Sequence, residues 1–532
     1  MGLVHRRLEA RVVAGKLDGQ VTKMKRLLLA LLLMGCGLLP GTARAHVGSP
    51  NIFFEGQAGP YPVRVVIRPA EVIPGLAEIS VRVEAGQVES VTALPIKWNA
   101  GRLGAPPPDV AKPVRGETNL YSAQLWFMES GAQSVELAIT GAAGTGTVVI
   151  PADAVATRVL PLPKALGAIL AVLGLLLLTL LLSIVGAAVR ESVLQPGLEP
   201  PQRRRWYARS AVTIAACLLV ALLWGGKRWW ASEASDYRNN RLYHPLVAQA
   251  HVRAENGRRL LRLEITDPAF SRTTPLVPDH GKLMHLFLMR EPKLDAFAHL
   301  HPIKLDRKTF ETTLPELPAG DYRLYADFTY ETGLADTLTT TVTIPEAAGG
   351  ATSVAESSDP DDSWRVAPEL GARRTRECRL TEQCVMTCTT PGRIEANKPI
   401  TLDFRVTQAD GRPATLQTYL GMRGHLSLRR DDGTVFTHLH PGGSASMAAM
   451  QLAVYRIEGK LPLQAAFGAD DPLCRLPTPA AREQGWIGGN QRSDGVSFPY
   501  AFPKPGLYRL WVQVKMDSQV RTGVFDVDVV SS

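Results

Sequence analysis

The sequence predicts a mainly β protein with three sandwich domains and a two-helix transmembrane hairpin between the first and the second. Three observations predict this fold: short segments of alternating polarity separated by Gly and Pro, two long apolar stretches, and a histidine motif that occurs twice. The chain has 532 residues, of which 45% are apolar and 20% charged. It is therefore long enough for about three or four domains of ordinary size.

The N-terminal region has the pattern of a secretory signal. The basic segment Met24–Arg26 precedes an apolar run over 27–39 and the small-residue site Ala43–Ala45. We interpret residues 1–45 as an N-terminal extension and signal peptide, cleaved before His46. An uncleaved membrane anchor is the alternative. Because the first 23 residues add no apolar core, Met24 is an alternative start.

Residues 46–160 are predicted to form an exported β-sandwich. Apolar side chains alternate with polar ones at 79–83 and again at 135–139, which places the apolar set on one face of a strand. Several such segments with turn residues at short intervals are typical of a sandwich.

Two apolar stretches are predicted to cross a membrane. The stretch 165–189 is uncharged and long enough for a hydrocarbon core of about 30 Å. The stretch 210–226 is shorter, and tryptophans near its end suit the interface. The loop 190–209 carries five Arg against two Glu, which indicates the cytoplasmic side. We therefore predict a multi-pass protein of the cytoplasmic (inner) membrane, bound to its lipid bilayer, with the large domains on the periplasmic side.

The regions 243–346 and 375–532 are predicted to be copies of one β-sandwich, joined by a flexible linker at 347–374. His285 lies fourteen residues before His299 in a His-Leu-His-Pro motif, and His425 lies thirteen residues before the same motif at His438. Both regions later contain Gly-x-Tyr-Arg-Leu followed by an aromatic residue. The shared order and spacing indicate a duplicated domain.

The repeated histidines predict a metal site in each copy. Residues two apart on a strand share a face, so each His-x-His pair presents two imidazoles together, and a hairpin would bring the earlier histidine beside them. Three imidazoles suit copper, zinc or nickel, and nearby thioethers favour copper. Buried structural histidines are the alternative. The predicted ligands are His285, His299, His301, His425, His438 and His440, with Met284 and Met447.

His46 and the cysteines are further candidates. As the mature N-terminus, His46 would offer an amine and an imidazole to Cu(II), although its domain has no second histidine, and a terminal residue without a ligand role is the alternative. Four exported cysteines allow two disulfides in any of three connectivities, and a Cu(I) thiolate site is the alternative use. These cysteines are Cys378, Cys384, Cys388 and Cys474.

The sequence gives little support to nucleic-acid binding or catalysis. Of the net charge of +9, residues 1–45 contribute +6, so the remaining +3 is unremarkable. The sequence has no glycine-rich phosphate loop and no nucleophile elbow. We predict neither an enzyme nor a nucleic-acid partner.

The repeated unit resembles the small exported domains of the YtkA/FixH-like and CopC-like kind, over residues 243–345 and 393–530. This resemblance implies immunoglobulin-like or cupredoxin-like sandwiches and a link to copper handling or to cytochrome oxidase assembly. The first domain, which begins at His46, also resembles these domains but lacks a downstream histidine. The predicted function is thus non-catalytic metal handling, with copper as the cofactor and a respiratory-assembly or other envelope protein as a partner. The alternative is an envelope interaction scaffold whose histidines are structural.

Overall fold

The structure is a computed structural model of the 532-residue chain. It describes residues 51–195, 197–267, 275–346, 359–372, 376–390, 392–461 and 493–532. The described residues belong to one compact unit. The predicted signal peptide, His46 and Cys474 lie outside the described residues.

The first domain has two sheets that enclose a common apolar core. One sheet has the order β1-β2-β3-β7-β6 and the other β5-β4-β8-β9. Alternate residues of β3, such as Ile79 and Val81, are fully buried in this core, as the sequence pattern predicts. Its elements are β1 (Ile52–Ala58), β2 (Tyr61–Arg68), β3 (Gly75–Val83), β4 (Val88–Lys97), the 3-10 turn η1 (Arg102–Gly104), β5 (Asp109–Val110), β6 (Lys112–Pro113), β7 (Leu120–Phe127), β8 (Gly131–Gly141) and β9 (Gly144–Ala154).

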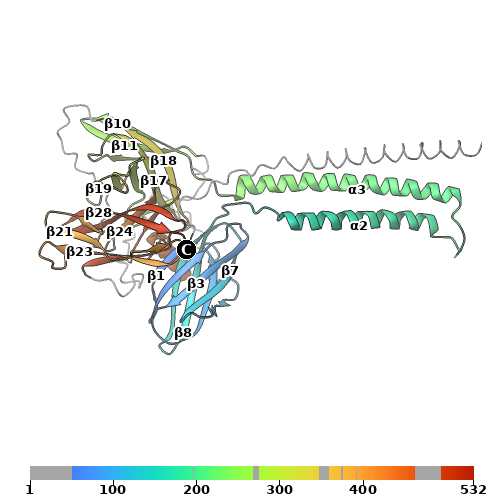
Figure 1. Ribbon diagram of the computed structural model, residues 1–532, viewed down its shortest axis with the longest axis horizontal. Helices are drawn as coiled ribbons and strands as arrows, with labels where there is room; N and C mark the ends of the chain where they lie inside the picture. Colours follow the sequence, from blue (N-terminus) through green and yellow to red (C-terminus); the bar gives the residue numbers. More distant parts are fainter. Residues whose placement is uncertain are drawn as a thin grey trace, which may run out of the picture. The chain divides into compact units, whose positions relative to one another are not determined.

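Two long helices follow, α2 (Lys164–Glu191) and α3 (Gln202–Asp236), and α3 ends in the short turn η2 (Tyr237–Arg241). By length and composition, both are apolar enough to cross a membrane. They run side by side (Figure 1), and a side chain at Gly186 would meet Val212 of the facing helix. The second helix is longer than the predicted stretch 210–226 because it continues into polar residues on both sides.

The second domain, called repeat 1 from here on, also has two sheets. Their orders are β10-β11-β16-β15 and β12-β17-β13-β14-β19, with β18 paired to β17. Its strands are β10 (Ala248–Glu255), β11 (Arg258–Ile265), β12 (Leu276–Val277), β13 (His285–Arg290), β14 (Ala296–Leu300), β15 (Ile303–Lys304), β16 (Thr309–Thr313), β17 (Gly320–Tyr330), β18 (Ala335–Ile344) and β19 (Ser363–Val366).

Strand β19 corrects the prediction of a flexible linker over 347–374 within the described residues 359–372, and the rest of that range lies outside the described residues. Its four residues pair with β14, with Ala298 opposite Trp364 and His299 opposite Ser363. The sequence pattern missed this strand because it has only four residues, and because backbone pairing to an existing sheet edge needs no long apolar periodicity.

The third domain, called repeat 2, has the sheet orders β20-β21-β23-β26 and β22-β28-β27-β24-β25. Its elements are β20 (Glu377–Arg379), β21 (Cys384–Cys388), β22 (Ile394–Glu395), β23 (Ile400–Gln408), β24 (His425–Arg430), β25 (Phe436–Leu439), α4 (Met447–Ile457), β26 (Gly495–Tyr500), β27 (Gly506–Met516) and β28 (Gln519–Val530).

The histidine-bearing sheets of the two repeats have matching registers. In repeat 1, β13 lies between β14 and β17, and in repeat 2, β24 lies between β25 and β27. His285 faces Asp327 across its strand pair, and His425 faces Gln513 at the corresponding place. The correspondence extends to the turn before each first histidine, where His280 and Leu420 both have a positive φ. The structure therefore repeats the same hairpin twice, as expected for a duplicated domain.

These two sheets pack against each other through aromatic residues. Phe297 of repeat 1 stacks on Trp511 of repeat 2 with ring centroids 5.0 Å apart. At the corresponding place, Phe436 of repeat 2 stacks on Tyr325 of repeat 1 at 3.9 Å. Because the other face of each sheet closes its own sandwich core, both faces of β13 and β14 are buried. The histidines lie within this packed face.

Candidate metal centre

Seven histidines gather where the two repeats meet. His285 and His425 begin β13 and β24, while His299 and His438 lie on the neighbouring strands β14 and β25. The remaining three lie in the turns next to these strands. The cluster consists of His280, His285, His299, His301, His425, His438 and His440. The side chains of His280 and His438 are 0% and 6% exposed, and the other five residues are at most 4% exposed.

The first triad is formed by His285, His299 and His301, as the sequence predicts. One nitrogen from each of the three rings lies within 4.8 Å of the others. The Nδ1 of His285 lies 3.0 Å from the Nε2 of His299. The hairpin β13–β14 produces this arrangement, because it folds the earlier histidine back beside the His-x-His pair.

The second triad, His425, His438 and His440, has nearly the same geometry. Its ring centroids lie 5.3, 5.1 and 4.6 Å apart, and the corresponding distances in the first triad are 5.3, 5.1 and 4.6 Å. The Nδ1 of His425 lies 3.1 Å from the Nε2 of His438. The duplicated sequence motif has thus produced the same arrangement of rings in repeat 2.

His280 was not among the predicted ligands, although it belongs to the cluster. Its Nε2 lies 3.3 Å from the Nε2 of His440. His280, His425 and His440 together form a further group whose nitrogens lie within 4.8 Å of one another. Sequence reasoning missed His280 because Leu420 occupies its place in repeat 2, so no repeated pattern marks it. It brings a ring from repeat 1 into the site of repeat 2.

The hydrogen bonds around the first triad fix the tautomer of each ring. The Nδ1 of His301 lies 2.9 Å from a carboxylate oxygen of Asp362, and the Nε2 of His285 lies 3.2 Å from the carbonyl oxygen of Asp279. Carboxylate and carbonyl oxygens only accept hydrogen bonds, so these ring nitrogens must carry the protons. The other nitrogen of each ring then carries a lone pair directed into the triad.

The tautomer of His299 is assigned in the same way. Its Nδ1 lies 3.0 Å from the Oε1 of Gln513 and 3.3 Å from the hydroxyl oxygen of Tyr419, whose proton is donated to the carbonyl oxygen of Asp361. The Nδ1 of His299 therefore carries the proton, and its Nε2 faces the Nδ1 of His285 with two lone pairs opposed at hydrogen-bonding distance. A proton or a metal ion between them removes this repulsion. Metal-bound histidines usually donate their outer nitrogen in this way.

The second triad repeats this arrangement with different partners. The Nε2 of His425 lies 3.3 Å from the carbonyl oxygen of Tyr419, and the Nδ1 of His438 lies 3.5 Å from a carboxylate oxygen of Asp327. The Nδ1 of His440 lies 3.3 Å from the carbonyl oxygen of Ala445. The Nδ1 of His425 and the Nε2 of His440 consequently carry lone pairs.

Burial keeps four of these imidazoles neutral, those of His285, His299, His438 and His440. It lowers the pKa of His285, His299 and His438 well below the ordinary value, and the neighbouring histidines lower it further. Burial also lowers the pKa of His440 to about 4. Since a metal ion binds the unprotonated ring, the sites are ready for a cation at neutral pH.

The other predicted ligands lie elsewhere. Met284 is fully buried in the core of repeat 1, and Met447 is buried at the start of α4 in the core of the first domain. Among the described cysteines, Cys378, Cys384 and Cys388 are unpaired, so the predicted disulfides find no support in this part of the chain. The side chains of Cys384 and Cys388 point from β21 into the core of repeat 2.

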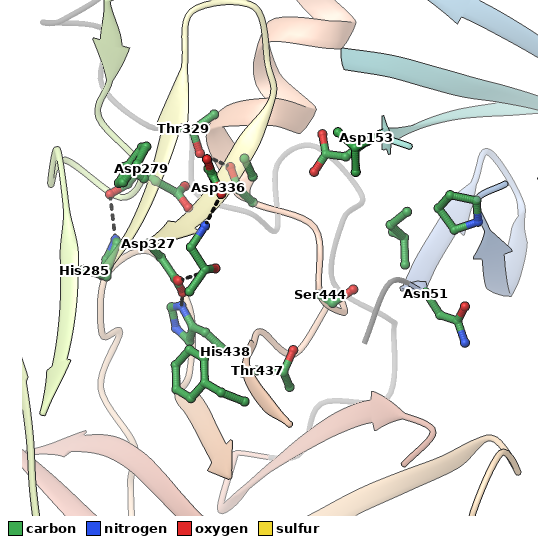
Figure 2. A pocket seen from close by; sticks show the side chains of 18 of the residues that line it. Asn51, Asp153, Asp279, His285, Asp327, Thr329, Asp336, Thr437, His438 and Ser444 are labelled. Atoms are coloured by element: carbon green, nitrogen blue, oxygen red, sulfur yellow. Dashed lines mark hydrogen bonds and ion pairs between the residues drawn. The ribbon is translucent and has the colours of Figure 1, made fainter. Parts of the chain in front are cut away.

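A cavity of about 170 Å³ borders the cluster. Figure 2 shows Asp153, Asp336 and Asp327 along it, with His438 beyond them. Burial raises the pKa of Asp153 and Asp327 to about 7 and that of Asp279 to about 6. These carboxyl groups are poorly solvated, and a cation in the cavity would stabilise their charged forms.

Residues 247–346, 381–470 and 477–531 match a protein family described as "Domain of unknown function (DUF8832)". The match covers most of both repeats and leaves the first domain and the long helices outside. No curated protein matches the chain.

Solved structures resemble the chain only weakly. A tetra-tandem repeat from the extending region of a large adhesion protein is 9% identical, with 86% of this chain and 70% of that chain covered, at a TM-score of 0.14. The dimeric latent PorU from Porphyromonas gingivalis is 8% identical, with 88% and 32% covered, also at 0.14. Scores this low carry no argument about fold or function. None of the comparisons bears on the YtkA/FixH-like and CopC-like resemblance, which stays a prediction.

Proposed function

We propose that the chain is a membrane-anchored metal-handling protein that binds two copper ions between its repeats and catalyses no reaction. The observation that carries this proposal is the pair of opposed ring nitrogens, 3.0 Å apart in the first triad and 3.1 Å in the second. Two ligands at about 2.0 Å from a tetrahedral metal lie about 3.3 Å apart, so only a small adjustment would seat an ion in each triad.

Copper is the preferred ion because the inner ligands are neutral imidazoles. Nitrogen sites of this kind bind Cu²⁺ more tightly than the other divalent first-row metals, and imidazole also suits zinc and nickel. The dry aromatic surroundings, with Phe287 stacked 4.3 Å from His299, would favour a closed site without bound water. A closed site suits storage or transfer of the ion better than catalysis.

The membrane location is part of the proposal. The helices α2 and α3 are long and apolar enough to span a bilayer, and the arginine-rich loop between them would lie in the cytoplasm. This orientation places all three sandwiches, and hence the seven histidines, on the periplasmic face of the cytoplasmic membrane. A metal-handling protein there could deliver copper to an envelope or respiratory-assembly partner.

A scaffold with structural histidines is the second candidate. Phe287 lies 4.3 Å from His299 and 4.9 Å from His438, measured between ring centroids, and this shielding is what a structural role would produce. The backbone carbonyl groups that accept hydrogen bonds from His285 and His425 also favour a structural role. In the first triad, however, the facing nitrogens of His285 and His299 both carry lone pairs, whereas buried polar atoms in a purely structural network normally face a complementary partner.

Metal titration of the full-length chain in detergent tests the proposal. We expect about two copper ions per chain, one ion when His299 and His301 are both changed to Gln, and none when His438 and His440 are changed as well. Isothermal titration with Cu(I) and Cu(II), beside Zn²⁺, measures these stoichiometries and identifies the preferred ion.

The matched control is His251→Gln, since His251 is exposed on repeat 1 away from the cluster. It should bind two ions like the parent chain. Weak binding that is the same in the parent and the four-histidine variant would reject metal handling in favour of the scaffold.

A further inference from the structure

The cavity beside the histidines is built by all three exported domains. Its lining includes Asn51 and Asp153 from the first domain, Asp327 and Asp336 from repeat 1, and Ser444 from repeat 2. Its volume of about 170 Å³ leaves room for several water molecules. A metal ion that keeps much of its hydration shell would fit there.

Three imidazoles of the cluster form part of the cavity wall, namely His285, His438 and His440. They come from both triads. The other four histidines of the cluster do not line it. Among the described residues, this cavity therefore gives an ion contact with both metal triads from a single space.

The wall of the cavity is acidic. It contains Asp153, Asp279, Asp327, Asp336 and Glu71, against one lysine, Lys282, whose ammonium group bonds to Asp359. Glu71 pairs with Arg158, and Asp336 accepts a hydrogen bond from the hydroxyl group of Tyr243. A cation that enters the cavity favours the ionised form of these carboxyl groups, whose oxygens can replace part of its hydration shell.

The first domain is attached to the loop that carries the last histidine. The backbone N–H of Glu55 donates to the carbonyl oxygen of Gly442 at 2.9 Å, and the N–H of Ser444 donates to that of Phe53 at 2.9 Å. These bonds hold the strand β1 against the residues that follow His440. The first domain has no described histidine of its own, so its contribution to the centre is this wall and the carboxylate of Asp153.

We propose that this cavity is a loading chamber, in which carboxylates hold an incoming hydrated metal cation before it passes to His438 and His285. The proposal rests on the metal-handling function above and assigns a role to the first domain. The ion exchanges water and carboxylate oxygens for imidazole nitrogens as it moves inward, and no bond in the protein is made or broken.

The rate of metal uptake by the full-length chain tests the chamber. The double variant Asp153→Asn/Asp336→Asn removes two carboxyl groups from the wall of the cavity. Copper is supplied on a weak chromogenic chelator, and the loss of the chelator's absorbance is followed by stopped flow. We expect the uptake rate constant to fall about tenfold and to lose most of its dependence on ionic strength, while the number of ions bound stays at two.

Two control variants test whether slower metal uptake results from a folding defect. Asp153→Glu keeps the charge and should take up metal nearly as fast as the parent chain. Asp109→Asn removes an exposed carboxylate from the first domain and should leave the rate unchanged. An unchanged rate in the double variant, with two ions bound, would overturn the chamber alone. A parent chain that takes up no metal would overturn the metal-handling function, and the chamber with it.

Discussion

The two triads have the same ring geometry but different surroundings. The comparison therefore separates the features that determine the geometry of the site from those that adjust its affinity. The first histidine of each triad donates to a backbone carbonyl. The other supports are Asp362 and Gln513 in repeat 1, and Asp327 and the carbonyl oxygen of Ala445 in repeat 2. The hairpin and the His-x-His spacing are common to both, so they determine the geometry. The outer partners differ, and they can give the two sites different affinities.

The partners also cross between repeats. Gln513 of repeat 2 supports His299 of repeat 1, and Asp327 of repeat 1 lies beside His438 of repeat 2. These two supports occupy corresponding positions, opposite the first histidine of their own sheets. Each triad is therefore complete only when the other repeat is in place.

The largest effect is expected from breaking the interface that brings the triads together. Phe297→Ala and Phe436→Ala each remove a buried ring that stacks on the other repeat, and we expect each to destabilise the protein by about 3–5 kcal/mol. Chemical denaturation of the full-length chain, with metal chelated, measures the loss. Trp126→Ala is the control, because that ring is 56% exposed, and an equal loss there would contradict the interface assignment.

The second-largest effect is expected on metal affinity when the first histidine of the His-x-His pair is changed in each triad. His299→Gln should weaken its site by about a hundredfold or more, because that triad loses one of three ligands. His438→Gln should cost less than about tenfold, because His280 offers a substitute nitrogen beside His440. Competition titrations give both affinities. Equal losses would show that His280 does not act as a ligand.

A smaller effect is expected from the outer partner of His301. Asp362→Asn weakens the acceptor that orients the ring, and we expect the affinity of the first triad to fall about 10- to 100-fold while the second is unaffected. Asp361→Asn is the matched control, because its carboxylate bonds to Lys515 rather than to a histidine. A comparable loss in the control would mean that the loop as a whole, and not this carboxylate, supports the site.

The smallest effect is expected on the stability of a variant that leaves every histidine unchanged. Burial raises the pKa of Asp153 to about 7 from 3.8, so between these values the native state binds more protons than the unfolded state and loses stability as the pH rises. The metal-free Asp153→Asn variant lacks this loss. We expect its stability relative to the parent to increase by about 2 kcal/mol from pH 4 to pH 8, after allowance for the open side of the cavity. Denaturation midpoints across this range measure the trend, and a flat difference would contradict it.

The sequence predicted the triad of repeat 1 correctly because its determinants are local. A two-residue strand period and a short hairpin are enough to bring His285 to His299 and His301. The duplicated motif then identified the equivalent residues of repeat 2. The alternation of apolar residues likewise predicted the sandwich strands of the first domain.

What the sequence did not reveal depends on contacts between distant segments. Asp362 and Ser363 lie in a stretch whose composition favoured a linker, and Gln513 lies 214 residues from the ring it supports. His280 has no equivalent in repeat 2, so duplication could not point to it. The joining of two predicted sites into one seven-histidine cluster follows from the packing of the two repeats, which no local pattern encodes.

The sheet of repeat 1 that is buried on both faces has a consequence for how the protein is made. During synthesis repeat 1 is completed long before β27 of repeat 2 emerges, so the aromatic face around Phe287 and Phe297 is left without its cover for that interval. Such a face is prone to aggregate or to pair with repeat 2 of another chain. Efficient biogenesis would then need slow translation, a chaperone for the nascent chain, or rapid docking of the second repeat.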